Sequence, residues 1–271
     1  MSDPRVKANM IGYAEGEAPY MVPITPESDL VRTIAMIKGT GATGVKLYAA
    51  LDASLVRAIT SEAHRAGLQV WAHSTVFPAK PIEIIEAGVD AVSHAAYLVW
   101  EAAPASEDFT ERGRGDFARV PADGAEMERV IDAMVRNQTV LDPTLMIFQQ
   151  RDETEEDSRR ARWGNEFTRR AHEAGVRIAA GTDRVGEPLA GELPAVHGEM
   201  SVLVDQVGLT PLEALSAATL GGAYAIGIQD EVGSIRSGKV ADLLLLSADP
   251  SVDIRNTRAI VHVIRAGNII R

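Results

Sequence analysis

Four side chains able to bind a metal ion or transfer a proton stand at similar places in the chain. Lys46, His73, His94 and Asp183 each lie at the end of a short apolar segment that predicts a β-strand. In a (β/α) barrel the C-terminal ends of the strands converge on the mouth of the active site. We therefore expect these four side chains to gather there. Because the chain has no cysteine, any metal must be held by nitrogen and oxygen atoms.

The alternation of side chains around Lys46 agrees with this placement. Successive side chains of a strand face opposite sides, so Lys46 points away from the side that Val45 and Leu47 share. If those two face the helices, Lys46 faces the barrel interior, where an amine is costly to bury without a function. The alternative is a lysine at a strand end whose amine reaches out to solvent.

The other three candidates also have purely structural explanations. His73 and His94 could be satisfied core histidines, and Asp183 could cap the segment that follows it. Two histidines at the last positions of neighbouring predicted strands weaken the first explanation. We therefore prefer the functional interpretation for the set.

A regular alternation of short apolar runs and amphipathic segments begins near Pro26 and positions these residues. It predicts strands over residues 44–48, 68–73, 89–94, 139–145 and 176–183. It predicts helices over residues 28–39, 52–67, 81–87, 123–137, 153–174, 193–208 and 210–227. The predicted fold is α/β, a partial (β/α)8 barrel of the TIM type with about five βα units.

The pattern changes after residue 230, where short strands are predicted within 233–246 and 260–271. We expect an N-terminal extension over 1–25, a partial barrel domain over 26–230 and a small C-terminal β element over 231–271. A long connection over 101–124 follows the strand that ends in His94. Its length and position favour a lid over the active-site face rather than a linker.

Composition narrows the classes of partner. The formal net charge of −11 at pH 7 argues against nucleic acid and anionic membranes, because both polyanions would repel the protein. A small neutral or cationic ligand fits better. The start of the chain lacks the pattern of a signal peptide, and no run of about 18 apolar residues occurs. We expect a cytoplasmic protein.

Six segments in order resemble motifs of the amidohydrolase superfamily, in particular its imidazolonepropionase-like and Xaa-Pro-dipeptidase-like branch. They are Gly44-Val-Lys-Leu-Tyr, Trp71-Ala-His-Ser, Val92-Ser-His-Ala, Gly181-Thr-Asp, the stretch from Gly208 to Thr219 and the stretch from Val232 to Leu246. Each motif alone is weak. Their order along residues 26–271 is specific, and the last resembles the family's C-terminal β-sandwich segment.

This resemblance implies a metal-dependent hydrolase of amide, cyclic amide, peptide or ester bonds in a small molecule. It implies that Lys46 is carboxylated and bridges two metal ions, and that His73 and His94 bind one of them. Asp183 would bind the other ion and act as the general base. Zinc is the first expectation, with manganese, cobalt or iron as alternatives.

Four further residues are candidates for contact with substrate. Tyr48 and Tyr97 lie just past ligand positions and could line the pocket, although aromatic packing explains them equally well. His197 and Glu199 begin the region after Asp183 and could also touch substrate. For these two we favour exposure to solvent or a local capping role.

The chain also departs from the family pattern. The superfamily's first strand carries a His-x-His pair, and no such pair occurs in this sequence. The chain could be truncated, a minimal form that binds one metal or completes its barrel with a second copy, or a non-catalytic relic or binding module. An open half-barrel would expose sheet edges and apolar faces, so we expect a homo-oligomer.

Overall fold

The computed structural model describes residues 1, 21–103, 115–149, 154–184 and 193–271. These residues form two compact units, Met1–Thr139 and Val140–Arg271, which are described separately. Residues 2–20 of the expected N-terminal extension and residues 104–114 of the expected lid lie outside the described residues.

Three parallel strands form the sheet of the first unit. They are β1 (Gly44–Leu47), β2 (Gln69–His73) and β3 (Ala91–Ser93), paired in that order. Val45 lies opposite Val70, and Trp71 lies opposite Ala91. The parallel order confirms the predicted βα rhythm, because parallel neighbours need a crossover between them.

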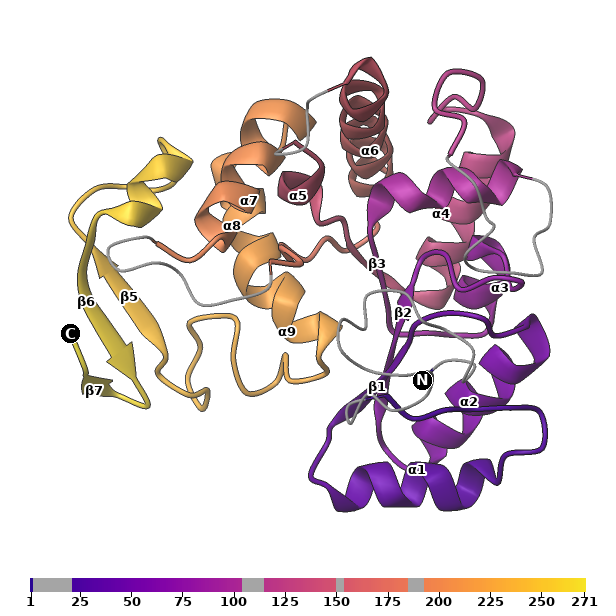
Figure 1. Ribbon diagram of the computed structural model, residues 1–271. Coiled ribbons are helices and arrows are strands. Elements are labelled where there is room, and N and C mark those ends of the chain that lie inside the picture. Colours follow the sequence, from indigo (N-terminus) through magenta and orange to yellow (C-terminus); the bar gives the residue numbers. More distant parts are fainter. Residues whose placement is uncertain (2–20, 104–114, 150–153, 185–192) are drawn as a thin grey trace. The chain divides into compact units, whose positions relative to one another are not determined.

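Four α-helices of this unit pack in succession beside the strands. They are α1 (Leu30–Gly39), α2 (Ala53–Arg65), α3 (Pro81–Glu86) and α4 (Ala125–Asn137), and each contacts the next (Figure 1). A 3₁₀ segment, η1 (Ala95–Ala102), follows β3. The side chain of Asp29 caps α1 and that of Asp52 caps α2, as their positions before the apolar periods predict.

The second unit begins with a short strand and is mainly helical. Its elements are β4 (Val140–Asp142), α5 (Leu145–Gln149), α6 (Glu155–Glu173), α7 (Val196–Val202), the π-helical η3 (Leu203–Val207), α8 (Pro211–Ser216), the π-helical η4 (Ala217–Gly221) and α9 (Gly222–Ala225). A capping box of Thr210 and Glu213 opens α8, at the start of the helix predicted over 210–227.

Two strand predictions in this unit are wrong in detail. The strand predicted over 139–145 ends at Asp142, because Pro143 cannot donate to a ladder, and Leu145 already begins α5. Residues 176–183 form no strand among the described residues. They are joined to β4 by one parallel bridge between Ile178 and Leu141.

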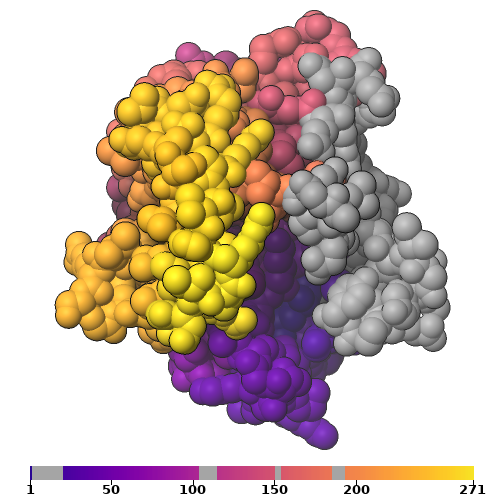
Figure 2. Space-filling model, turned by 90° about the vertical axis from the view of Figure 1, so that its left-hand side faces the viewer, coloured from indigo at the N-terminus to yellow at the C-terminus, as the bar shows by residue number. Residues whose placement is uncertain are grey.

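The C-terminal residues form the small β element that the sequence predicts. The strands β5 (Leu243–Leu246), β6 (Ile260–Arg265) and β7 (Asn268–Ile269) are antiparallel in that order, and the 3₁₀ segment η5 (Ile254–Arg258) precedes β6. The stretch 233–235, also predicted as a strand, is irregular. Leu244 and Leu245 face opposite sides and are each about half exposed, at 51% and 52%. Figure 2 shows this segment in yellow at the surface.

The described residues show a parallel sheet without a closed barrel. None of the helices they form has both the length and the apolar character that crossing a bilayer requires.

Candidate functional site

Two buried histidines stand side by side at the carboxyl ends of neighbouring strands. His73 is the last residue of β2, and His94 directly follows β3. Their ring centroids are 4.5 Å apart. The Nδ1 atom of His73 lies 2.9 Å from the hydroxyl of Thr75, a contact that orients the ring. This is the arrangement expected of two imidazoles that bind one ion.

Lys46 lies on β1, the strand that pairs with β2, and its amine reaches the region of the two histidines. Its Nζ is 3.3 Å from the hydroxyl of Ser93, the residue before His94. The predicted alternation is confirmed, because Val45 and Leu47 are buried while Lys46 is not. The expectation that the lysine itself is buried is wrong, because its side chain is exposed in the described structure.

The charge of Lys46 affects the neighbouring imidazole. Burial, and then the positive charge of Lys46, lower the pKa of His94 to about 3. His94 is therefore neutral near pH 7, the form in which an imidazole binds a metal ion.

Aromatic rings surround the two histidines. Tyr97 lies with its ring centroid 5.4 Å from His73 and 5.5 Å from His94, and Tyr48 meets His73 edge to face at 5.6 Å. Trp100 in turn packs edge to face on Tyr97 at 5.1 Å. Both predicted tyrosines thus lie beside the candidate ligands. Their contacts fit a pocket wall and aromatic packing alike.

Asp183 belongs to the second unit and is exposed there. It has a backbone φ of +46°, and His94 has a φ of +76°. Non-glycine residues rarely adopt this left-handed region, and the strain they store is concentrated at functional sites. The structure brings Lys46, His73 and His94 together in the first unit, and the approach of Asp183 to them stays a prediction.

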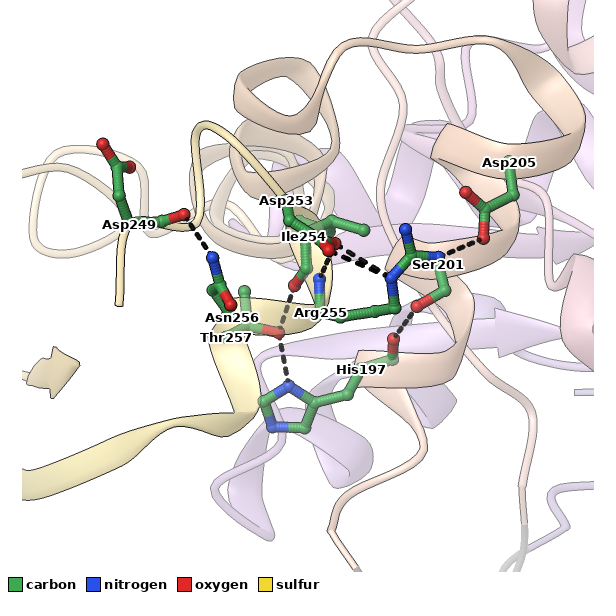
Figure 3. Close-up of polar contacts among 9 residues, drawn as sticks. All are labelled: His197, Ser201, Asp205, Asp249, Asp253, Ile254, Arg255, Asn256 and Thr257. Atoms are coloured by element: carbon green, nitrogen blue, oxygen red, sulfur yellow. Dashed lines mark hydrogen bonds and ion pairs between the residues drawn. The ribbon is translucent and has the colours of Figure 1, made fainter. Parts of the chain in front are cut away.

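His197 is buried, with 6% of its surface exposed, so the expectation that it faces solvent is wrong. Its Nδ1 lies 2.9 Å from the hydroxyl of Thr257, which itself donates to the carbonyl of Ile254 at 2.8 Å (Figure 3). Burial, and then the charge of Arg258, lower the pKa of His197. The ring therefore serves as a neutral hydrogen-bond donor to Thr257.

Glu199 is the functional candidate that the sequence analysis undervalued. Its side chain is fully buried, and its two carboxylate oxygens accept the backbone N–H groups of Leu145 and Met146, each at 2.8 Å. Burial raises the pKa of Glu199 to about 7, and the charge of Asp142 adds to the rise. The only sequence signal was its place two residues after His197.

Comparison with known proteins shows to which family the chain belongs. Residues 15–270 match the Amidohydrolase family. The chain belongs to this family. The resemblance inferred from the motifs is thereby confirmed. The α/β class of the fold is confirmed as well, since the parallel sheet of the chain superposes on solved structures of that class.

Two curated relatives illustrate the similarity in sequence. Imidazolonepropionase from Geobacillus kaustophilus is 37% identical over 106 residues, which cover 38% of this amidohydrolase and 24% of the relative. Ochratoxinase from Aspergillus niger is 37% identical over 106 residues, which cover 37% of this chain and 21% of the relative. The matched stretch is thus a quarter or less of either relative.

Two solved structures show the shared fold. A Xaa-Pro dipeptidase with bound methionine superposes with a TM-score of 0.70 at 22% identity, covering 96% of this amidohydrolase and 63% of that chain. The ochratoxinase of Aspergillus niger superposes with a TM-score of 0.67 at 23% identity, covering 90% and 54%. This amidohydrolase spans less than two thirds of the length of either structure.

Members of the superfamily generally depend on metal ions, so a member is expected to contain side chains that can hold them. Within the described ranges, no group of three or more histidines, aspartates and glutamates is close enough to hold an ion. His73 and His94, with Lys46 beside them, are side chains of the types that bind such ions. The residues of the first unit therefore fit part of a metal centre.

Proposed function

We propose that this amidohydrolase is a metal-dependent hydrolase that cleaves an amide, cyclic amide, peptide or ester bond in a small molecule. The observation that carries the proposal is the pair of buried imidazoles, 4.5 Å apart, with Lys46 on the adjoining strand. The family membership supports hydrolysis. The substrate class is what the resemblance to the family implies, and the metal is inferred from that resemblance together with the residue types.

In this proposal His73 and His94 hold a divalent ion, with zinc first and manganese, cobalt or iron as alternatives. Lys46, if carboxylated, would add oxygen ligands for such ions. The bound metal would lower the pKa of a water molecule so that hydroxide forms near neutral pH. The low pKa of His94 supports its role, because the ring need not lose a proton to bind.

Asp183 is proposed as a further ligand and as the general base. Its carboxylate would accept a proton from the attacking water and pass it to the leaving group. Its φ of +46° is a strained backbone conformation of the kind that is concentrated at functional sites. Tyr48 and Tyr97 would orient the histidine rings and contact the substrate. His197 could reach substrate through Nε2, since Nδ1 contacts Thr257.

The lack of a His-x-His pair among the 271 residues favours a second candidate function. In that alternative the protein is a non-catalytic relic or binding module of the same family. Retention of His73, His94 and Asp183 argues against it, since ionisable side chains that are buried, as in the two histidines, or held at a strained φ, as in Asp183, are costly without a function.

Elemental analysis of the purified chain separates the two functions. We expect at least one equivalent of zinc or manganese, lost in a variant with His73→Ala and His94→Ala together. The matched control is His262→Ala in the C-terminal β element, which should keep the metal. Metal retained by the double variant would place the site elsewhere. A metal-free wild type that hydrolyses no amide or ester would favour the relic.

We also propose a homo-oligomer. Apolar side chains of the C-terminal β element are exposed, among them Leu244, Leu245 and Ile269. Light scattering coupled to size exclusion should give a dimer or a larger species, and a monomer would contradict this proposal.

A further inference from the structure

A buried carboxylate fixes the turn that follows β4. The two oxygens of Glu199 accept the N–H groups of Leu145 and Met146, which are 54 and 53 residues away in sequence. Since the carboxylate is fully buried, neither N–H group has water as a substitute partner. Two parallel hydrogen bonds to one carboxyl group also define its orientation.

The turn needs such a restraint. Thr144 has a φ of +48°, in the left-handed region that a β-branched residue avoids. A conformation of this kind persists only where the surroundings overdetermine it. Helix α7 approaches the turn closely, since a Cβ on Gly198 would lie 2.4 Å from the sulfur of Met146. Glycine at 198 thus lets Glu199 come within reach of the two N–H groups.

The other end of the turn contacts the segment that carries Asp183. Asp142, the last residue of β4, packs its carboxylate against Gly181, where an added Cβ would lie 2.1 Å from Oδ1. The backbone is tied one residue earlier, since Leu141 donates to the carbonyl of Arg177 and accepts from Ala179, at 2.9 and 2.8 Å. Asp183 follows two residues after Gly181.

We propose that Glu199 is a positioning residue for Asp183. Its carboxylate holds the turn over residues 142–146. That turn holds Asp142 against Gly181, and this contact fixes the position of the backbone that carries Asp183. The catalytic consequence rests on the proposed hydrolase function, whereas the structural coupling does not. No contact between Glu199 and substrate is involved.

The first test is structural and independent of activity. In Glu199→Gln one carboxylate oxygen becomes an NH₂ group, which cannot accept a hydrogen bond. Amide exchange at Leu145 and Met146 should become about ten- to a hundredfold faster, and the backbone amide resonances of Gly181, Thr182 and Asp183 should shift.

The matched control is Glu213→Gln, which removes a carboxylate with two comparable hydrogen bonds to Thr210, at 2.8 and 2.7 Å, elsewhere in the same unit. The proposal would be overturned if the resonances of residues 181–183 shifted no further in Glu199→Gln than in Glu213→Gln. If Glu199→Gln does not fold, Glu199→Asp, which keeps the charge and shortens the reach, is measured instead with the same criterion.

The second test is kinetic. We expect Glu199→Gln to lower kcat about tenfold or more, with KM within about twofold of wild type. Metal content is measured beside it, because Asp183 is itself proposed as a ligand. A wild-type kcat in Glu199→Gln, or a rise in KM with kcat unchanged, would overturn the proposal. A wild-type protein without hydrolytic activity would end the proposed function, while the resonance shifts would still decide the coupling.

Discussion

His197 donates its Nδ1 hydrogen to the hydroxyl of Thr257, which lies 60 residues further along the chain, across 2.9 Å. The contact joins α7 to η5 and so anchors the C-terminal β element to the helices of its unit (Figure 3). A second link, between Arg255 and Asp205 at 3.3 Å, lies at the surface beside it. The buried link carries more of the attachment, because exposed ion pairs contribute little.

Replacing Thr257 by valine should therefore lower stability more than breaking the surface link. The change leaves the buried N–H of His197 without an acceptor, at a cost of about 1–3 kcal/mol. Urea unfolding measures the loss, and Arg255→Gln, expected to cost less than about 1 kcal/mol, is the control. Equal losses in the two variants would show that the buried link is not the anchor.

Stability should fall with rising pH through the titration of Glu199. Its pKa rises from 4.5 to about 7 on folding, chiefly because it is buried, so the folded state holds the proton more tightly. The contribution of this shift to the free energy of unfolding is fully present below about pH 4.5 and is lost as the pH rises to about 7. It amounts to roughly 3 kcal/mol. Urea unfolding across this range should give a flatter dependence for Glu199→Gln.

Glu213 supplies the contrasting case. Hydrogen bonds from Thr210 lower its pKa to about 2, so its contribution is present above about pH 4.5 and is lost as the pH falls. Glu213→Gln should therefore leave the dependence between pH 4.5 and 7 unchanged. If both variants flatten the curve alike, Glu199 is not its source.

Asp183→Asn should abolish hydrolysis while leaving the fold nearly intact. Asparagine tolerates a positive φ but cannot accept the proton, so we expect kcat to fall at least about a hundredfold. Circular dichroism checks the fold. Asp205→Asn, which removes an acid that pairs with Arg255, should keep its turnover. Undiminished hydrolysis in Asp183→Asn would refute the role of Asp183 as base.

Gly181→Ala should be destabilising because the new methyl group overlaps the carboxylate of Asp142. Overpacking of this kind costs about 1–3 kcal/mol. Gly222→Ala is the matched control, since nothing lies within 4 Å of its added Cβ and alanine favours the helix. Thermal melting should give a lower Tm for Gly181→Ala than for Gly222→Ala. An unchanged Tm in Gly181→Ala would show that Asp142 can move away from the added methyl group.

Local patterns predicted much of the fold. Asp29 and Asp52 stand before amphipathic periods, and both cap helices; Lys46 sits between two apolar residues, and it points away from both. These features depend on neighbours within four residues. The strand ends at His73 and near His94 follow from the same short-range alternation, which is why the two imidazoles could be expected side by side.

The features that the sequence did not predict depend on partners far along the chain. Glu199 bonds to amides more than 50 residues away, and His197 bonds to a hydroxyl 60 residues away, so neither contact leaves a local pattern. The helix that begins at Leu145 follows a turn strained at Thr144. That strain is opposed by the distant carboxylate of Glu199, and β-branched composition alone favoured a longer strand there.

The left-handed backbone at His94 and Asp183 limits which residues evolution or an engineer can place at these two positions. Glycine and asparagine fit the dihedral angles with little penalty, whereas valine, isoleucine and threonine clash with the backbone. Mutational libraries at 94 and 183 should consequently be dominated by folded variants with short polar or no side chains. New chemistry beside His94 is therefore easier to introduce at Tyr48 and Tyr97, which are not among the residues with a positive φ.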